Sequence, residues 1–136
     1  MPPALIDTDI LSAIMRQQAE ALVAARVYLA THKQFTISVI TRYEILRGLK
    51  AKGAPTQIVT FSRFCEANYL LPVTDEIIDR AADIYADLYR RGALIGDADI
   101  LIAASAQVYQ LVLVTNNENH FRRIPGLRIE NWLVSS

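Results

Sequence analysis

The chain has 136 residues, of which 52% are hydrophobic and 21% are charged, and its formal net charge at pH 7 is zero. This composition excludes an intrinsically disordered chain, and the length predicts a single domain over residues 1–136. The balanced charge argues against a protein that coats nucleic acid through bulk electrostatics, because such proteins need a basic surplus. The single Cys65 excludes an intramolecular disulfide framework and a cysteine-rich zinc site.

No targeting signal is expected in this sequence. The chain opens with Met1-Pro2-Pro3 and reaches Asp7 after a short apolar run, without the basic region of a secretory signal. The longest apolar stretch, residues 100–114, is interrupted by polar side chains and is shorter than the roughly 20 residues that a membrane span needs. We therefore expect a soluble, cytoplasmic protein with no membrane contact.

Short apolar or β-branched runs alternate with helical patterns along the chain. Thr74 is expected to cap one of the helices, since two acidic residues follow it. The alternation predicts an α/β fold with parallel strands and helices on both faces of the sheet. Strands are predicted at residues 4–6, 35–39, 69–73, 111–114 and 127–129, and helices at 11–15, 19–30, 40–50, from about 56, from 75, and at 100–109.

Acidic residues stand where several of these apolar runs end. Asp7 follows the first strand, Glu44 lies on the helix after the second, and Asp99 precedes the most apolar helix. Ligands gather at the carboxyl ends of parallel strands, so we expect the three side chains to converge at that edge. Carboxylates about 4 Å apart repel each other by roughly 1–4 kcal/mol. Mg²⁺ or Mn²⁺ would relieve this repulsion, because hard cations prefer oxygen ligands.

Each acidic residue also has a purely structural interpretation. Asp7 could cap a turn, and Thr41-x-x-Glu44 fits a capping box, although Ser38 competes as the N-cap of the same helix. Asp99 would be favoured by the helix dipole, with Asp97 as the N-cap. No single position therefore decides between a site and a set of caps.

Histidine and basic side chains offer a second kind of chemistry. A metal-free ribonuclease would need a general acid and a general base, and His32 and His120 are the two histidines available. A solvated surface position is the alternative for both. Basic side chains that could bind phosphate, or simply face solvent, are Arg42, Arg47, Lys50, Lys52, Arg90, Arg91, Arg122 and Arg123.

Four motifs together resemble PIN-domain proteins, and the match is strongest to the VapC-type toxins of bacterial type II toxin–antitoxin systems. The resemblance covers almost the whole chain in order. Its motifs are Leu5-Ile6-Asp7-Thr8-Asp9-Ile10-Leu11, Tyr43-Glu44-Ile45, Asp99-x-Leu101-Ile102-Ala103-Ala104, and Leu113-Val114-Thr115-Asn116-Asn117 with the downstream Phe121, Pro125 and Trp132.

This resemblance implies a PIN-like three-layer sandwich around a mainly parallel sheet of four to five strands, over residues 1–136. It also implies a Mg²⁺- or Mn²⁺-dependent endoribonuclease toxin that cleaves a structured RNA, for which tRNA is one candidate, through a metal-activated water. A cognate antitoxin and a homodimer are the implied protein partners. The antitoxin could bind a groove formed by the 40–50 helix and the helix from residue 56.

The resemblance also implies roles for individual residues. Asp7, Glu44 and Asp99 match the three catalytic acids of the family. Asp7 and Asp99 would bind the metal directly, and Glu44 directly or through water. Asn117 falls where many members carry a fourth acid, which puts tight binding of a second metal in doubt. The secondary positions are Asp9, Asp97, Thr115 and Asn117.

Two other functions are compatible with parts of the sequence. A catalytically silent PIN-like module would bind RNA or a partner without cleaving it. A haloacid-dehalogenase-type phosphatase would use Asp7 as nucleophile in Asp7-x-Asp9, but it needs a downstream lysine, and the chain has none after Lys52.

Overall fold

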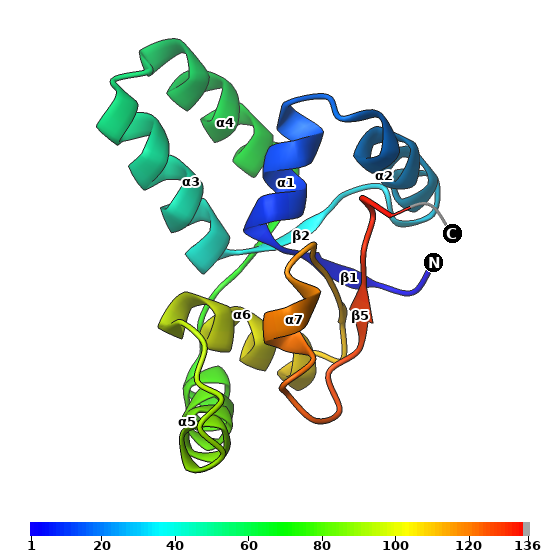
Figure 1. Cartoon of the computed structure of the whole chain (residues 1–136). Coiled ribbons are helices and arrows are strands. Elements are labelled where there is room, and N and C mark those ends of the chain that lie inside the picture. Colours follow the sequence, from blue (N-terminus) through cyan, green and yellow to red (C-terminus); the bar gives the residue numbers. More distant parts are fainter. Residues whose placement is uncertain (135–136) are drawn as a thin grey trace.

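Five parallel strands form one sheet at the centre of the molecule (Figure 1). The computed structural model describes residues 1–134. The strand order is β3-β2-β1-β4-β5, so the first strand lies in the middle of the sheet. The strands are β1 (Ala4–Ile6), β2 (Thr36–Ser38), β3 (Tyr69–Leu71), β4 (Val112–Val114) and β5 (Ile129–Glu130).

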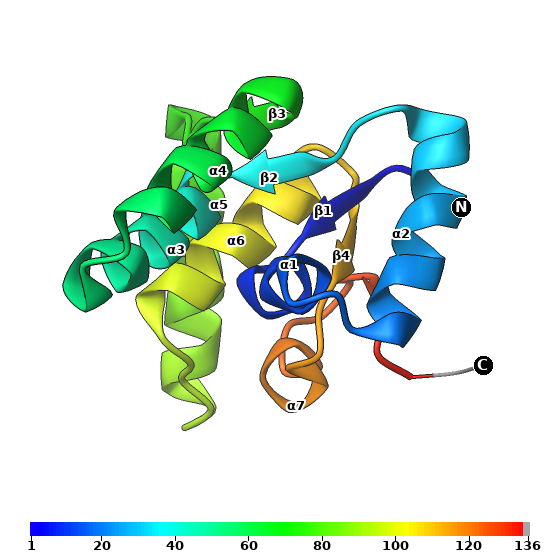
Figure 2. The same ribbon diagram turned by 90° about the horizontal axis from the view of Figure 1, so that it is seen from above.

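Helices cover both faces of the sheet, which confirms the predicted three-layer α/β architecture (Figures 1 and 2). One face is covered by the first four helices and the other by the last three, according to the side chains that pack together in each core. The helices are α1 (Thr8–Met15), α2 (Ala19–His32), α3 (Val39–Lys52), α4 (Pro55–Ala67), α5 (Asp75–Arg90), α6 (Asp97–Val108) and α7 (Glu118–Phe121).

The alternation of side chains along the central strands creates two separate cores. In β1, Leu5 packs with the core beneath α5 and α6, whereas Ala4 and Ile6 pack with the core beneath α1 to α4. In β4, Leu113 joins the first core and its two neighbours join the second. Successive side chains of a strand point to opposite faces, so strands buried on both faces read as continuous apolar runs.

Aromatic side chains close the second core near the chain termini. The rings of Tyr28, Phe35 and Trp132 form a triangle, with the Tyr28 centroid 6.0 Å from that of Phe35 and 5.5 Å from that of Trp132. The Tyr28 hydroxyl accepts a hydrogen bond from the backbone N–H of Ala4 at 3.1 Å, which secures the first residue of β1. Phe61 of α4 is fully buried in the same core. A side chain of this size contributes roughly 1.5–3 kcal/mol when it is removed from water.

Helix starts are where the structure corrects the sequence predictions. The first helix begins at Thr8 rather than at residue 11, because Asp7 itself is the N-cap. The prediction that Asp97 caps the sixth helix is wrong, since Gly96 occupies the cap and Asp97 is the first helical residue. Thr74 caps α5 as predicted. The fifth strand lies at Ile129–Glu130, so only the last residue of the predicted 127–129 strand is in it.

Two further sequence predictions concern the whole chain. No helix within residues 1–134 is long and apolar enough to cross a membrane. The predicted single domain covers residues 1–136, of which 135 and 136 lie outside the described residues. The other 134 residues include all five strands of the one sheet.

Candidate active site

The side chain of Asp7 connects the carboxyl ends of β1 and β4 through a hydrogen bond. Asp7 directly follows β1 and is 5% exposed. Its Oδ1 accepts the backbone N–H of Thr8 at 2.8 Å, and its Oδ2 accepts the hydroxyl of Thr115 at 2.7 Å. Thr115 follows β4 directly and is fully buried. The structural role of Asp7 as a helix cap therefore coexists with a place at the carboxyl edge of the sheet.

Asp9 organises the loop that follows β4. It lies in the first turn of α1, where its Oδ1 accepts the backbone N–H of Ile10 at 2.7 Å. Its Oδ2 accepts the backbone N–H of Asn116 at 3.0 Å. The next residue, Asn117, donates its backbone N–H to the Thr115 hydroxyl at 3.0 Å. Asp9 thus fixes the backbone that presents Thr115 and Asn117 at this edge.

Glu44 is connected to the same edge through Thr8. The Thr8 hydroxyl donates to Oε1 of Glu44 at 2.7 Å and lies 3.1 Å from the hydroxyl of Thr41. A threonine hydroxyl has one hydrogen, so Thr41 donates to Thr8 while Thr8 donates to Glu44. Ser38 caps α3 through its hydroxyl, so Glu44 is not part of a capping box. Arg47 approaches Glu44 only to 3.9 Å.

Asp99 faces His120 across the site. It lies in the first turn of α6, and its Oδ2 is 3.2 Å from Nδ1 of His120. The side-chain nitrogen of Asn117 lies 2.8 Å from that same ring nitrogen. A bare Nδ1 can accept from the Asn117 amide but cannot donate to Asp99, whereas a protonated Nδ1 donates to the carboxylate. His120 therefore lies in the site, whereas His32 lies 2.8 Å from the Met1 carbonyl oxygen and stacks on Tyr28.

Burial and crowding make this edge unfavourable for negative charge. Burial raises the pKa of Asp7 to about 7, with a further upward contribution from the charges of Asp9 and Asp99 and a downward one from the Thr115 and Thr8 hydrogen bonds. Burial also raises the pKa of Asp9, whereas the hydrogen bonds from the backbone of Asn116 and Ile10 lower it. The amino ends of α1 and α6 offset part of this cost, since a helix amino end carries partial positive charge.

The predicted acidic side chains lie at the same edge of the sheet, but they are not arranged as the ligands of one metal ion. Within residues 1–134, no group of three His, Cys, Asp or Glu side chains could hold a metal ion in the observed arrangement. Both of the acids other than Asp7 have polar neighbours within the site, since Glu44 accepts from the Thr8 hydroxyl and Asp99 lies 3.2 Å from Nδ1 of His120. Asp97 is exposed at the start of α6, and no described hydrogen bond or ion pair joins its side chain to the others. The oxygen donors nevertheless suit a hard cation, which would relieve the charge around Asp7.

Two contributions to this site were not found from the sequence. Thr8 was read only as part of a motif, whereas its hydroxyl connects α1 to Glu44, 36 residues away. The backbone N–H of Asn116 binds Asp9 over 107 residues. A small hydroxyl residue between two acids at a strand end is the one local signal that could have indicated the first contact.

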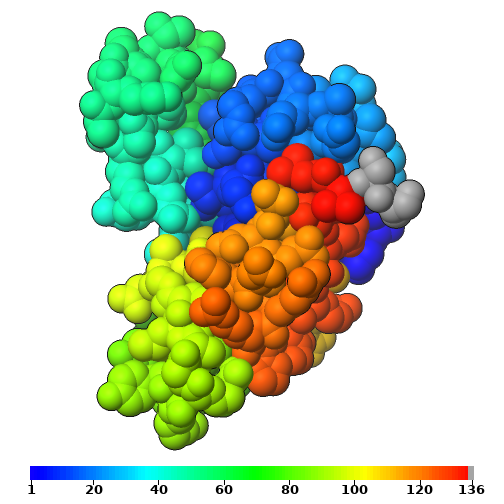
Figure 3. Space-filling view, in the orientation of Figure 1, coloured from blue at the N-terminus to red at the C-terminus, as the bar shows by residue number. Residues whose placement is uncertain are grey.

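A notch separates the α3–α4 pair from α6 on the surface of the molecule (Figure 3). The residues just described come from both sides of it, with Glu44 on α3 and Asp99 at the start of α6. Next to Glu44, a cavity of about 570 Å³ lies between α1, α3 and α4, and both Thr8 and Glu44 line it. The acidic edge, formed by Asp7, Asp9, Glu44 and Asp99, is therefore continuous with a groove along the second core.

Comparison with known proteins identifies the family. The family model described as PIN domain matches residues 4–127. A tRNA(fMet)-specific endonuclease VapC from Salmonella typhimurium is 36% identical over 97 residues, which are 71% of this chain and 74% of that protein. A ribonuclease VapC from Haemophilus influenzae is 28% identical over 130 residues, 95% of this chain and 97% of that protein.

Solved structures agree with this assignment. The structure of DNA-bound VapBC from Salmonella typhimurium contains a chain that matches with a TM-score of 0.83 and 31% identity, over 97% of this chain and 99% of that one. VapBC2 from Rickettsia felis, bound to a DNA fragment from its promoter, matches with a TM-score of 0.84 and 27% identity, over 95% and 98% of the two chains. The resemblance seen in the sequence is thus confirmed, and the chain belongs to the PIN-domain family as a member of its VapC group.

Proposed function

We propose that this protein is the endoribonuclease toxin of a toxin–antitoxin pair and that it hydrolyses phosphodiester bonds in RNA. The observation that carries the proposal is the linked set of acidic side chains at the carboxyl edge of the sheet, in a chain related to proteins named ribonuclease VapC. The phosphatase alternative loses support, because its required lysine is missing and these relatives are ribonucleases. The relatives named as ribonuclease and endonuclease also favour cleavage over a silent binding module.

The residues that would hold a divalent cation are Asp7 and Asp99, with Glu44 directly or through water. Asp9 and Asn117 would support them from the edge of the site. Bound Mg²⁺ or Mn²⁺ would supply a water of lowered pKa and would neutralise charge on the phosphate. The raised pKa of Asp7 supports this assignment, because a cation favours the ionised form that burial disfavours.

The side chains around the acids have positioning roles in this proposal. Thr115 donates to one oxygen of Asp7 and the backbone of Thr8 donates to the other, so the orientation of this carboxylate is fixed. The Thr41–Thr8 pair does the same for one oxygen of Glu44. Preorganised groups of this kind need little rearrangement when a phosphate arrives, which is how electrostatic catalysis gains most of its effect.

The proposed substrate is a structured RNA with an unpaired loop. Proteins that read RNA sequence mostly bind unstacked bases in loops and bulges, because side chains cannot read the deep groove of an RNA helix. The relative from Salmonella typhimurium is named as specific for tRNA(fMet). We therefore propose tRNA as the first substrate to examine for this chain.

The proposed protein partner is an antitoxin that occupies the groove beside Glu44. Phe61, Phe64 and Leu49 line this groove with apolar surface, and Glu44 stands at its junction with the acidic edge. An amphipathic helix could place apolar side chains in such a groove. A basic side chain beyond that helix would then enter the acidic edge and oppose the cation, since it carries the same sign of charge.

A cleavage assay with matched variants tests the proposed activity. Purified protein and total tRNA are incubated with Mg²⁺ or Mn²⁺, and we expect cleavage that EDTA abolishes. Asp7→Asn and Asp99→Asn should be inactive. Asp79→Asn, which removes an exposed carboxylate on α5, should cleave normally. Metal-independent cleavage, or full activity of Asp7→Asn, would contradict the proposal.

A second assay tests the antitoxin. Cleavage is measured over a range of Mg²⁺ concentrations with full-length antitoxin and with antitoxin that lacks its C-terminal segment. We expect Mg²⁺ to weaken inhibition by the full-length protein alone. Equal inhibition by both forms at every Mg²⁺ concentration would refute blocking of the site. The homodimer stays a prediction, which analytical ultracentrifugation of the isolated protein would check.

A further inference from the structure

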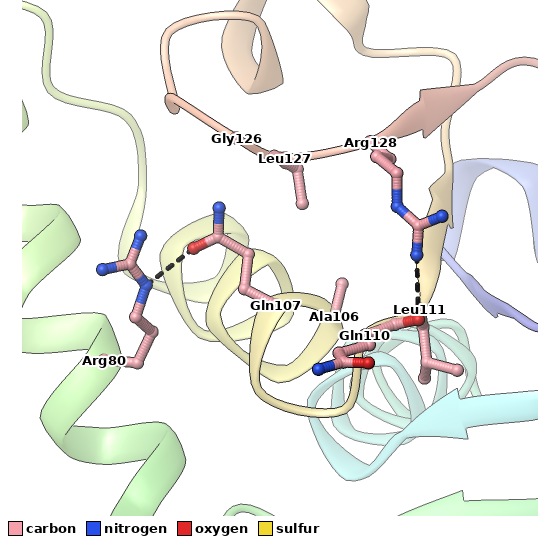
Figure 4. A pocket seen from close by; sticks show the side chains of 8 residues that line it. All are labelled: Arg80, Ala106, Gln107, Gln110, Leu111, Gly126, Leu127 and Arg128. Atoms are coloured by element: carbon pink, nitrogen blue, oxygen red, sulfur yellow. Dashed lines mark hydrogen bonds between the residues drawn. The ribbon is translucent and has the colours of Figure 1, made fainter.

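A second cavity lies at the opposite edge of the sheet from the acidic residues. It measures about 600 Å³ and is bounded by α5, the end of α6 and the segment before β5 (Figure 4). Leu111 directly precedes β4 and Arg128 directly precedes β5, so the cavity is at the amino ends of these strands. Asp7 and Thr115 are at the carboxyl ends. The two regions are thus separated by the length of β4, roughly 10 Å for three residues.

Two guanidinium groups give this cavity positive charge. Arg80 and Arg128 stand on opposite sides of it, and no aspartate or glutamate is among its lining residues (Figure 4). Among residues 1–134, neither arginine forms an ion pair with a carboxylate. Asp87, whose pKa is lowered in small part by Arg80, is itself paired with Arg91 at 2.7 Å. The positive charge of the cavity is therefore not neutralised by its own walls.

Hydrogen bonds hold both guanidinium groups in place and leave donors free for a ligand. Nε of Arg80 donates to Oε1 of Gln107 at 2.7 Å, and Nε2 of Gln107 donates to the carbonyl of Pro125 at 3.0 Å. Nη2 of Arg128 donates to the carbonyl of Gln110 at 3.0 Å. Each arginine has five N–H donors, and the described hydrogen bonds use one donor of Arg80 and one of Arg128. Most donors of each therefore remain available for an anion. Arginine held in this way suits phosphate, which accepts two donors at once.

The floor between the arginines is apolar. Ala106 is fully buried, and the half-buried Leu111 and Leu127 pack against the same core. Gly126 has a φ of +80°, a conformation that side-chain-bearing residues rarely adopt, and it forms part of the wall beside Gln107. A ligand that suits this lining has an apolar part and negative charge for the arginines. A nucleotide unit, with a base and its phosphates, has this combination.

We infer that this cavity is a non-catalytic binding site for a phosphate-bearing nucleotide, either free or within an RNA strand. The acidic edge repels phosphate when no cation is bound, whereas this cavity attracts it at all times. An RNA strand anchored here would remain attached to the protein independently of metal. The inference does not require that the acidic edge be catalytic, so either proposal can fail alone.

The test measures binding without a divalent cation. AMP and octauridylate are titrated into the protein in EDTA by calorimetry, at several salt concentrations. We expect Arg80→Gln/Arg128→Gln to bind roughly tenfold more weakly or worse, because two charge-assisted contacts are lost. The slope of log K against log salt for octauridylate should fall in magnitude by about 1.4, which corresponds to two phosphate contacts on a single strand. Arg26→Gln, an exposed arginine on α2 outside this cavity, should bind like the wild type.

The pattern of outcomes identifies the source of the phosphate. Binding of AMP alone supports a free nucleotide, and binding of octauridylate alone or of both supports an RNA strand. If neither ligand binds at low salt, or if the double variant binds as tightly as the wild type, the inference is wrong. Should the double variant not fold, NMR titrations of the wild type test binding in the cavity instead. Ligand bound there is expected to shift the side-chain amide resonances of Gln107 and Gln110. Unchanged amide resonances at saturating ligand would also refute it.

Discussion

Asp7→Asn is expected to stabilise the isolated protein although it removes the central carboxylate of the proposed site. The carboxyl group is 5% exposed and lies near Asp9 and Asp99, whose charges add to the cost of ionising it. Asparagine keeps the side-chain oxygen that caps α1 through the Thr8 N–H. It carries no charge, so the variant avoids the ionisation cost in the folded state.

The size of the effect follows from the pKa of Asp7, which is about 7 in the folded protein against an ordinary value of 3.8. Between these pH values the folded protein retains a proton that the unfolded chain releases, so the wild type loses stability as the pH rises. Each pKa unit corresponds to about 1.4 kcal/mol, which sets an upper bound of roughly 4 kcal/mol above pH 7. Since the lost contact with Thr115 costs stability at every pH, we expect a net gain of about 2 kcal/mol at pH 8 and a net loss of up to about 2 kcal/mol at pH 4.

Urea unfolding in EDTA, followed by fluorescence, measures this difference. Trp132 is the only tryptophan of the chain and is buried, so its emission reports the loss of the second core. Wild type and variant are compared at intervals between pH 4 and pH 8, with equal m-values as the condition for comparison. A stability difference that does not change with pH, or a variant less stable than the wild type at pH 8, would refute the reasoning.

Asp87→Asn provides a control, because Asp87 should change the stability of the folded state with pH in the opposite direction from Asp7. Asp87 is partly exposed, and its hydrogen bond to Arg91 lowers its pKa below the ordinary value. Such a group stabilises the folded state above the unfolded pKa, and this contribution is lost as the pH falls through the folded pKa. The variant should therefore be equal to or slightly less stable than the wild type at neutral pH, with the difference vanishing in acid.

Three further outcomes are expected. Asn117→Asp should raise Mn²⁺ affinity in calorimetric titrations, because it adds a carboxylate beside Asp99 and His120; unchanged affinity would place residue 117 outside the site. Thr8→Val should lower both Mn²⁺ affinity and kcat while Thr8→Ser restores them, and normal activity of the valine variant would exclude the positioning of Glu44 by Thr8. Phe61→Ala should cost about 3–5 kcal/mol of unfolding free energy in urea titrations, and a loss below 1 kcal/mol would contradict its place in the core.

The parts of this molecule that the sequence predicted are those set by local patterns. β1 is a short apolar run that ends at an acid, and Thr74 precedes two acids at the start of α5, so both were located correctly. Ser38 was recognised as a competing cap, and it does cap α3. Interactions of this kind depend on residues within one turn of each other, so a single sequence contains them.

Contacts between distant segments could not be predicted in the same way. The bond between Thr115 and Asp7 spans 108 residues, and nothing in either segment specifies the other as its partner. The cap of α6 was also misplaced, because an acid at the first helical position and an acid at the cap look alike in sequence. The Arg80 and Arg128 cavity requires three segments to meet, so it was visible only after folding.

The central position of β1 has a consequence for the synthesis of the protein. Residues 4–6 emerge from the ribosome long before residues 112–114, which are their neighbour on one side. A nascent chain therefore has one side of its middle strand unpaired until residues 112–114 have been made, and long-range pairing of this kind forms late and slowly. Asp7, Thr115 and Asp99 cannot meet before then. Under the proposed function, a nascent chain that lacks β4 therefore has no assembled acidic site, and an antitoxin needs to capture only chains in which β4 has been made.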